Sequence, residues 1–220
     1  LVAVVEVPWE GCSSPDNIEA VREAIEKEEH AMTEKWGRLT PVTTEEMASL
    51  SEHEKRTAHQ LRCSVTQKKI TPEEIAEGKT EGRWKARIVS KDLKCRYKKP
   101  YEDTHAAVPP LDAFRLMVAT TNVNDTDVYM TDFDNVYLQA RDREGRRRLV
   151  CITDLETGVR RYHWQNGVIY GDQEGAKEWK DEVVHKLTAK DMGFVEGLNA
   201  PSTYVNTEQG IKVIMHVDDP

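Results

Sequence analysis

The hydrophobic and polar positions change their period along the chain, and each change predicts an element. Apolar residues recur every three or four positions from Ile18 to Met32, after a capping sequence at 13–16. This spacing predicts a helix that ends near residue 36. A second helical pattern covers about 43–59. The N-terminal part therefore reads as an acidic, helical lead-in.

Further along, short alternating runs predict strands that pair as hairpins. The runs at 61–69 and 84–90 flank an acidic helical turn, and those at 149–153 and 159–164 flank a loop that ends in Gly158. A mostly apolar helix is predicted at 111–119, between the two hairpins, and a second helix that carries Trp179 is predicted to run to about residue 192. The remaining elements are the strands at 128–132, 202–206 and 211–217.

Two of these strands end in carboxylates. The run from Val128 ends at Asp132, and the last strand is followed by Asp218 and Asp219. Each site alone is typical of a turn or a helix cap. The two sites are 86 positions apart (218 − 132), so a fold would have to bring them together. If it does, three carboxylates converge as a pair of divalent cations requires.

Composition narrows the class of protein. The chain has 220 residues and a net charge of −8, so contacts with nucleic acid would have to come from local basic patches. The four cysteines are scattered, which argues against a zinc site or a disulfide framework and favours a reducing compartment. No basic, apolar leader marks a signal peptide, and no run is long enough to span a membrane. We expect an intracellular protein, cytoplasmic or nuclear.

Several dispersed blocks agree in order with one family. The blocks are Lys85–Lys91, Asp132–Leu138, Ile169–Gly171 with Trp179, Met192–Phe194, Pro201–Val205 and Val217–Asp219. Together they resemble the reverse transcriptase of copia-type LTR retrotransposons over roughly residues 60–220. The resemblance implies an α+β, right-hand polymerase fold with fingers near 60–107 and 141–178 and a partial palm near 108–140 and 179–220. Residues 1–59 form the lead-in.

The resemblance also implies an RNA-directed DNA polymerase and assigns its site. Asp132, Asp218 and Asp219 would hold two Mg²⁺ or Mn²⁺ ions, with the Phe133 carbonyl as a further oxygen. The residues expected to bind the nucleotide are Lys85, Arg87, Tyr137 and Glu174. Those expected to bind nucleic acid are Lys91, Lys94, Arg96, Lys98, Lys99, Arg146 and Arg147. The implied partners are an RNA or DNA template–primer, a deoxynucleoside triphosphate and the remainder of a polyprotein.

Each of these assignments has a simpler structural alternative. Lys85 and Arg87 share one face of a strand because side chains alternate, and such a face is often just solvated. Tyr137 either lies under the incoming sugar or belongs to the core. Basic runs in an acidic chain are also commonly surface residues.

The sequence departs from the family at several points. Asp134 adds a carboxylate where a basic residue is common, Glu174 stands in place of a nucleotide-seating Gln, and His216 replaces a Tyr. Pro220 follows the carboxylates where a strand should begin, so we expect the chain as given not to polymerise. Two alternatives stay open: a catalytically dead remnant that at most binds nucleic acid, and an unrelated interaction module.

Overall fold

The structure is a computed structural model, and its elements divide into two compact units. The described residues are 5–6, 17–78, 82–91, 108–124, 126–131, 133, 135–140, 145 and 147–216. Unit 1 comprises Leu1–Tyr97 and Asp142–Asp172, and unit 2 comprises Lys98–Arg141 and Gln173–Pro220. Both units combine helices and strands, so the α+β class is confirmed. The predicted lead-in, residues 1–59, falls in unit 1.

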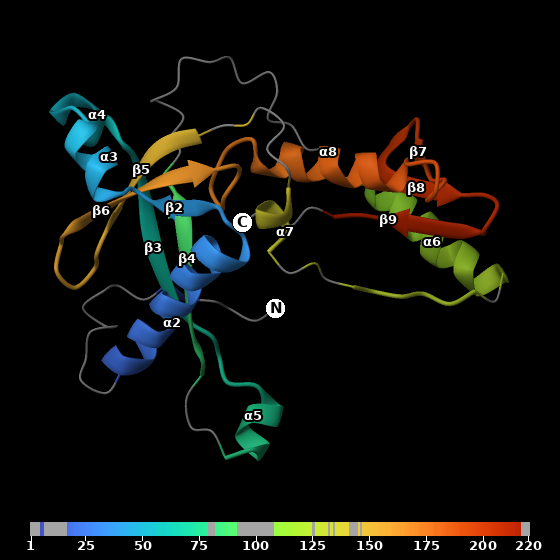
Figure 1. The fold of residues 1–220 in the computed structure, drawn as a ribbon. Helices are drawn as coiled ribbons and strands as arrows, with labels where there is room; N and C mark the ends of the chain where they lie inside the picture. Colours follow the sequence, from blue (N-terminus) through green and yellow to red (C-terminus); the bar gives the residue numbers. More distant parts are fainter. Residues whose placement is uncertain are drawn as a thin grey trace. The chain divides into compact units, whose positions relative to one another are not determined.

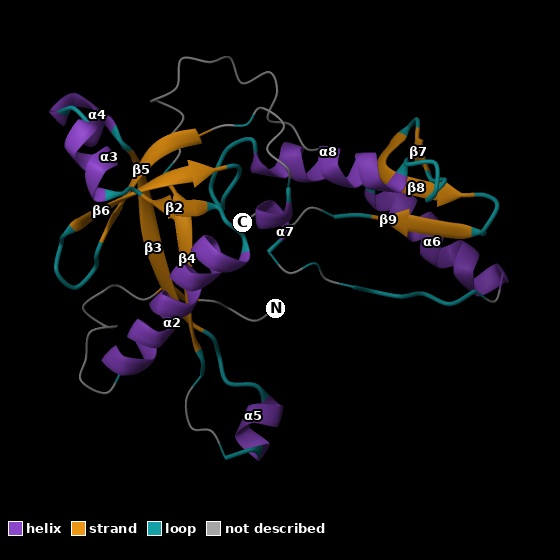
Figure 2. Cartoon of the chain, in the orientation of Figure 1, coloured by secondary structure: helices purple, strands orange, loops and turns teal. Residues whose placement is uncertain are grey.

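Unit 1 is built on a curled six-stranded sheet (Figures 1 and 2). Its strands are β1 (Val5–Glu6), β2 (Leu39–Pro41), β3 (His59–Gln67), β4 (Trp84–Ser90), β5 (Arg147–Thr153) and β6 (Arg160–Asn166). The order is β1-β3-β5-β6-β2, and β4 also pairs with β3. The predicted hairpins β3–β4 and β5–β6 are both present and antiparallel, and a short parallel pairing of β3 with β5 joins them.

One face of this sheet is covered by the predicted N-terminal helix. Helix α2 (Ile18–His30) continues as a π-helical turn, η1 (Ala31–Lys35), so the element ends within a residue of the predicted position. Val21 packs with Val65 of β3 and Ala86 of β4, and all three are buried. The apolar stripe that predicted the helix is thus the stripe that contacts the sheet.

Three short helices in unit 1 begin with the same local device. They are α3 (Thr44–Ser49), α4 (Glu52–Thr57) and α5 (Pro72–Ala76), and each has a reciprocal capping box. We expected a single helical stretch over 43–59. The structure has two helices because Ser51, with Glu54 three residues later, starts a new cap.

Unit 2 contains three helices and a small antiparallel sheet within its described part. The helices are α6 (Leu111–Asn124), α7 (Val136–Gln139) and α8 (Gly175–Leu187). The strands are β7 (Val195–Gly197), β8 (Ala200–Asn206) and β9 (Ile211–Ile214), in that order across the sheet. The predicted β8–β9 hairpin is confirmed. Helix α8 ends at Leu187 with Thr188 as its C-cap, so the expectation that the helix runs to about Met192 and is capped by Gly193 is wrong. Gly193 lies beyond the helix and has a positive φ of +66°.

The predicted strand at 128–132 is wrong over the residues that the structure describes. Val128–Thr131 forms no strand, and Tyr129 and Met130 are 88% and 95% exposed. Helix α6 keeps Leu111, Phe114 and Leu116 exposed. A β-prone sequence becomes a strand only when a neighbouring strand pairs with it and a packed surface receives its side chains, and here neither is formed.

Candidate nucleic-acid interface

The β3–β4 hairpin brings together Lys85 and Arg87, the two cations that the resemblance predicted to bind the incoming nucleotide. Lys85 lies opposite Thr66, and Arg87 lies opposite Ser64. Both therefore project from the same face of the hairpin. The opposite face carries Ala86 and is the one packed against α2.

The same register adds further cations to this surface. Lys68 lies beside Arg83, because its N–H donates to the Arg83 carbonyl over 3.0 Å, and Arg62 lies opposite Val89. Burial is the main cause of a lowered pKa at Lys85, and repulsion from Arg87, Lys68 and Arg83 lowers it further. We name the set the basic face: Arg62, Lys68, Arg83, Lys85 and Arg87.

Glu28 of α2 lies at the edge of β4 and interacts electrostatically with Lys85 and Arg87 of the basic face. Glu28 accepts the Ile88 N–H through Oε1 at 3.3 Å. Burial raises the pKa of the Glu28 carboxyl, whereas that hydrogen bond and the charges of Lys85 and Arg87 act in the opposite direction. Glu28 thus offsets part of the positive charge without removing it.

The loop at 167–172 lies against the end of β4. The Ser90 N–H donates to the Tyr170 carbonyl over 2.7 Å, and the Tyr170 ring lies 5.3 Å from the guanidinium carbon of Arg87. A Cβ at Gly171 would come within 2.5 Å of the Ser90 carbonyl oxygen, and its φ is +81°, so glycine is required here. Tyr170 and Gly171, which the sequence singled out as a family box, have a structural role beside the basic face.

Asp172 closes this loop onto the β5–β6 hairpin. It pairs with Arg148 and accepts hydrogen bonds from the Gln165 side chain at 2.8 Å and the Ile169 N–H at 2.9 Å. The loop that carries Tyr170 is therefore held at both ends.

The other predicted nucleic-acid contacts differ in their surroundings. Arg147, on β5, pairs with Glu46 at 3.2 Å and stacks over the Trp164 ring at 4.5 Å, so its charge is already compensated. Lys91 is exposed just after β4. Lys94, Arg96, Lys98, Lys99 and Arg146 lie outside the described residues.

The predicted catalytic carboxylates Asp132, Asp218 and Asp219 also lie outside the described residues, as does Asp134. Their neighbour Phe133 makes an edge-to-face contact with Trp179 of α8, with ring centroids 5.7 Å apart. Within the part of the chain that the structure describes, no group of three or more His, Cys, Asp or Glu side chains is placed to hold a metal ion.

Tyr137 and Glu174, the remaining predicted nucleotide contacts, belong to unit 2. Tyr137 is 5% exposed on α7, which packs against α8, so its ring is part of the core of this unit. Glu174 is the N-cap residue of α8. A carboxylate is favourable there because the N-terminal end of a helix is positive, which gives this departure from the family a local physical reason.

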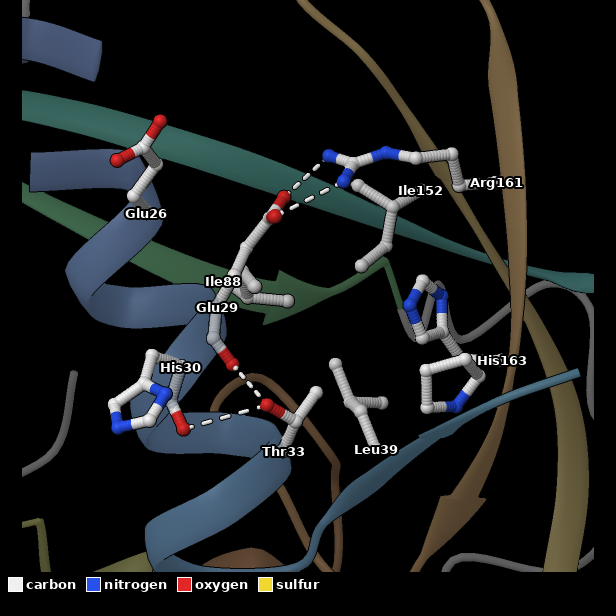
Figure 3. A pocket seen from close by; sticks show the side chains of 10 residues that line it. Glu26, Glu29, His30, Thr33, Leu39, Ile88, Ile152, Arg161 and His163 are labelled. Carbon is white, nitrogen blue, oxygen red and sulfur yellow. Dashed lines mark hydrogen bonds and ion pairs between the residues drawn. The ribbon is translucent and has the colours of Figure 1, made fainter. Parts of the chain in front are cut away.

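A cavity of about 310 Å³ lies between α2 and the sheet, on the face opposite the basic face (Figure 3). Arg161 donates hydrogen bonds to both carboxylate oxygens of Glu29 there, one of them 2.9 Å long. Thr33 donates to the Glu29 carbonyl at 3.0 Å, and burial is the main cause of a lowered pKa at His163. Glu29 and Arg161 pair with each other in this cavity, whereas Nε of Arg161 and Nδ1 of His163 are buried without a hydrogen-bond partner among the described residues. None of the sequence-predicted site residues that the structure describes lines the cavity.

Comparison with known proteins adds no identification: no family model matches the chain, and no solved structure matches it. None of the described helices is both long enough and apolar enough to cross a bilayer.

Proposed function

We propose that this chain is part of a nucleic-acid polymerase whose basic face binds phosphate groups. Within that class we propose the reverse transcriptase of a copia-type retrotransposon. The basic face would contact the template backbone or the triphosphate of an incoming nucleotide.

The observation that carries this proposal is the basic face itself. A chain with a net charge of −8 gathers these cations on one face, where burial and then repulsion from Arg87, Lys68 and Arg83 lower the pKa of Lys85. Like charges held together this way cost stability, and such clusters are common where a protein binds an anion.

The course of the chain supports the more specific assignment. The chain contributes in turn to unit 1, unit 2, unit 1 and unit 2, with changes at 97/98, 141/142 and 172/173. The resemblance implies the same alternation of fingers and palm, with changes at 107/108, 140/141 and 178/179. The identity of either unit as fingers or palm is part of the proposal.

The metal chemistry of the proposed enzyme belongs to residues outside the described part. Asp132, Asp218 and Asp219 would hold Mg²⁺ or Mn²⁺, and such ions lower the pKa of a primer hydroxyl and neutralise a triphosphate. The described residues would contribute phosphate binding through Lys85 and Arg87.

A binding experiment tests the proposal. We expect the chain to bind a template–primer duplex at low salt, and a variant that makes one phosphate contact fewer should have a slope of log K against log salt that is shallower by about one. Lys85→Met and Arg87→Met should each weaken binding in this way. Lys27→Met, which removes an exposed charge from α2 on the other side of the sheet, is the matched control. Equal behaviour of all three variants would refute the assignment of the basic face.

A second candidate is a catalytically dead remnant that still binds nucleic acid. Glu174 at the N-cap of α8 and the unpaired run Val128–Thr131 favour it. Primer extension separates the two candidates. Nucleotide incorporation that Asp132→Asn abolishes would exclude the remnant, and binding without incorporation would support it.

A further inference from the structure

The contact between Arg87 and Tyr170 makes one cation of the basic face different from the others. The guanidinium carbon lies 5.3 Å from the centroid of the Tyr170 ring, within the range of a cation–π interaction. Arg87 itself is exposed, whereas Tyr170 is 8% exposed. The charge is therefore available to solvent while the aromatic surface beside it is built into unit 1.

The Tyr170 ring is a fixed platform because its loop is fixed. Its carbonyl accepts the Ser90 N–H, and Gly171 allows the backbone to approach β4 more closely than a side chain would permit. The Ser90 hydroxyl is in turn within 2.7 Å of Nε2 of His59. Asp172 then ties the end of the loop to Arg148.

A ring beside a guanidinium can leave that group's hydrogen-bonding edge free. Arginine donates from the edge of its plane, in a fork that matches two oxygens of a phosphate. An arginine that is already oriented loses less rotamer freedom when it binds. A contact of this kind at an exposed site is worth about two- to fivefold in an equilibrium constant.

We propose that Tyr170 is a positioning residue that orients Arg87 for bidentate binding of a phosphate group. This inference rests on the proposed function, because it assumes that the basic face binds phosphates. The same chemistry serves a nucleic-acid backbone and a free triphosphate. The experiment below uses both as probes.

The test compares Tyr170→Phe, which keeps the ring, with Tyr170→Leu, which keeps an apolar side chain without an aromatic face. Dissociation constants are measured for a fluorescein-labelled 20-mer oligodeoxythymidylate and for inorganic triphosphate, over a range of salt. Tyr170→Phe should bind like the wild type, and Tyr170→Leu should bind about two- to fivefold more weakly. The probe whose binding is weakened by Tyr170→Leu identifies the source of the phosphate.

A double-mutant cycle separates positioning from general packing. If Tyr170 acts through Arg87, adding Tyr170→Leu to Arg87→Met should weaken binding no further. Additive effects, or an effect of Tyr170→Phe equal to that of Tyr170→Leu, would overturn the inference. If Arg87→Met alone leaves both dissociation constants unchanged, Arg87 binds no phosphate; that result overturns the proposed phosphate-binding role and, with it, the positioning role.

A measurement on the wild-type protein tests the same inference without relying on variants that could fail to fold. The Arg87 Nε–Hε resonance in NMR spectra should be shifted by the Tyr170 ring current and be more ordered than that of Arg83, an exposed cation of the same face. Equal shifts and order for Arg83 and Arg87 would show that Tyr170 does not orient Arg87, whatever the ligand.

Discussion

The two faces of the unit 1 sheet use charged residues in opposite ways. On the face covered by α2, arginines are matched with carboxylates: Arg161 with Glu29, and Arg22 with Glu156. The hydrogen bond that Arg161 donates to Glu29 is the main cause of a raised pKa at Arg161. On the basic face, burial and neighbouring cations lower the pKa of Lys85, and Glu28 offsets this only in part.

One face therefore carries charges that fasten an element, and the other carries like charges that repel one another. The paired arginines come from β6 and α2 and connect the helix to the β5–β6 hairpin. The cations of the basic face repel one another, so an anion bound there would relieve a cost that the fold already carries. Four changes test this comparison, from the largest expected effect to the smallest.

Gly171→Ala should destabilise unit 1 most. The new Cβ would lie 2.5 Å from a backbone oxygen of β4 and would hold a left-handed backbone, so we expect a decrease of about 2–4 kcal/mol in the free energy of unfolding. Gly158→Ala is the control, because it has a similar φ of +70° and open space around it; its decrease should be about 1 kcal/mol. Urea denaturation measures both, and equal decreases would show that the loop does not lie against β4.

Arg161→Met should lower the unfolding free energy by about 1–2 kcal/mol, because it leaves the partly buried Glu29 unpaired. The double variant with Glu29→Gln should be less destabilised than Arg161→Met alone. This ordering, measured in the same urea titrations, distinguishes a pair that fastens the helix from two independent surface charges. A double variant that is less stable than either single variant would contradict it.

His163 should make the covered face sensitive to mild acid. Burial, and to a smaller extent Arg161, lowers its pKa below the ordinary value of 6.5. The unfolded chain therefore takes up the proton first, and the stability that neutral His163 contributes is present above about pH 6.5 and is lost as pH falls through the folded-state value. Compared with His163→Gln, the wild type should show a steeper fall in melting temperature below pH 6.5. Parallel curves would mean that His163 does not titrate differently in the fold.

Lys85→Met should have the smallest effect, and of the opposite sign to Arg161→Met. It removes a partly buried charge that its neighbours repel, so stability should stay the same or rise by up to about 0.5 kcal/mol. Nucleic-acid binding should weaken in the same variant. A clear decrease in stability would place Lys85 among the fastening charges.

Local patterns in the sequence were enough to predict most of the elements. The alternation at 61–69 and 84–90 predicted the β3–β4 hairpin and the shared face of Lys85 and Arg87. The register of that hairpin, which adds Arg62, Lys68 and Arg83 to the same surface, requires the pairing between strands. No pattern within a single strand contains that information.

The contacts between distant segments could not be predicted. Nothing near Tyr170 in the sequence indicates that its ring meets Arg87, because the contact depends on the loop after β6 reaching the end of β4. The predicted strand at Val128–Thr131 is wrong because β propensity is a local property of the sequence, whereas a strand also needs a neighbouring strand to pair with. The predicted convergence of Asp132 with Asp218 lies outside the described residues and stays a prediction.

The parallel pairing of β3 with β5 constrains how unit 1 can form. His59 pairs with Val150, 91 positions later (150 − 59), and the first segment of unit 2 lies between them in sequence. A ribosome must therefore complete β5 before the sheet of unit 1 can close, and an N-terminal fragment ending before residue 147 would leave this side of β3 without its partner. Closing a loop of this length costs conformational entropy before the strands gain any contact, so the pairing forms slowly. We expect unit 1 to fold after synthesis of its second segment, with its two hairpins formed earlier as separate local structures.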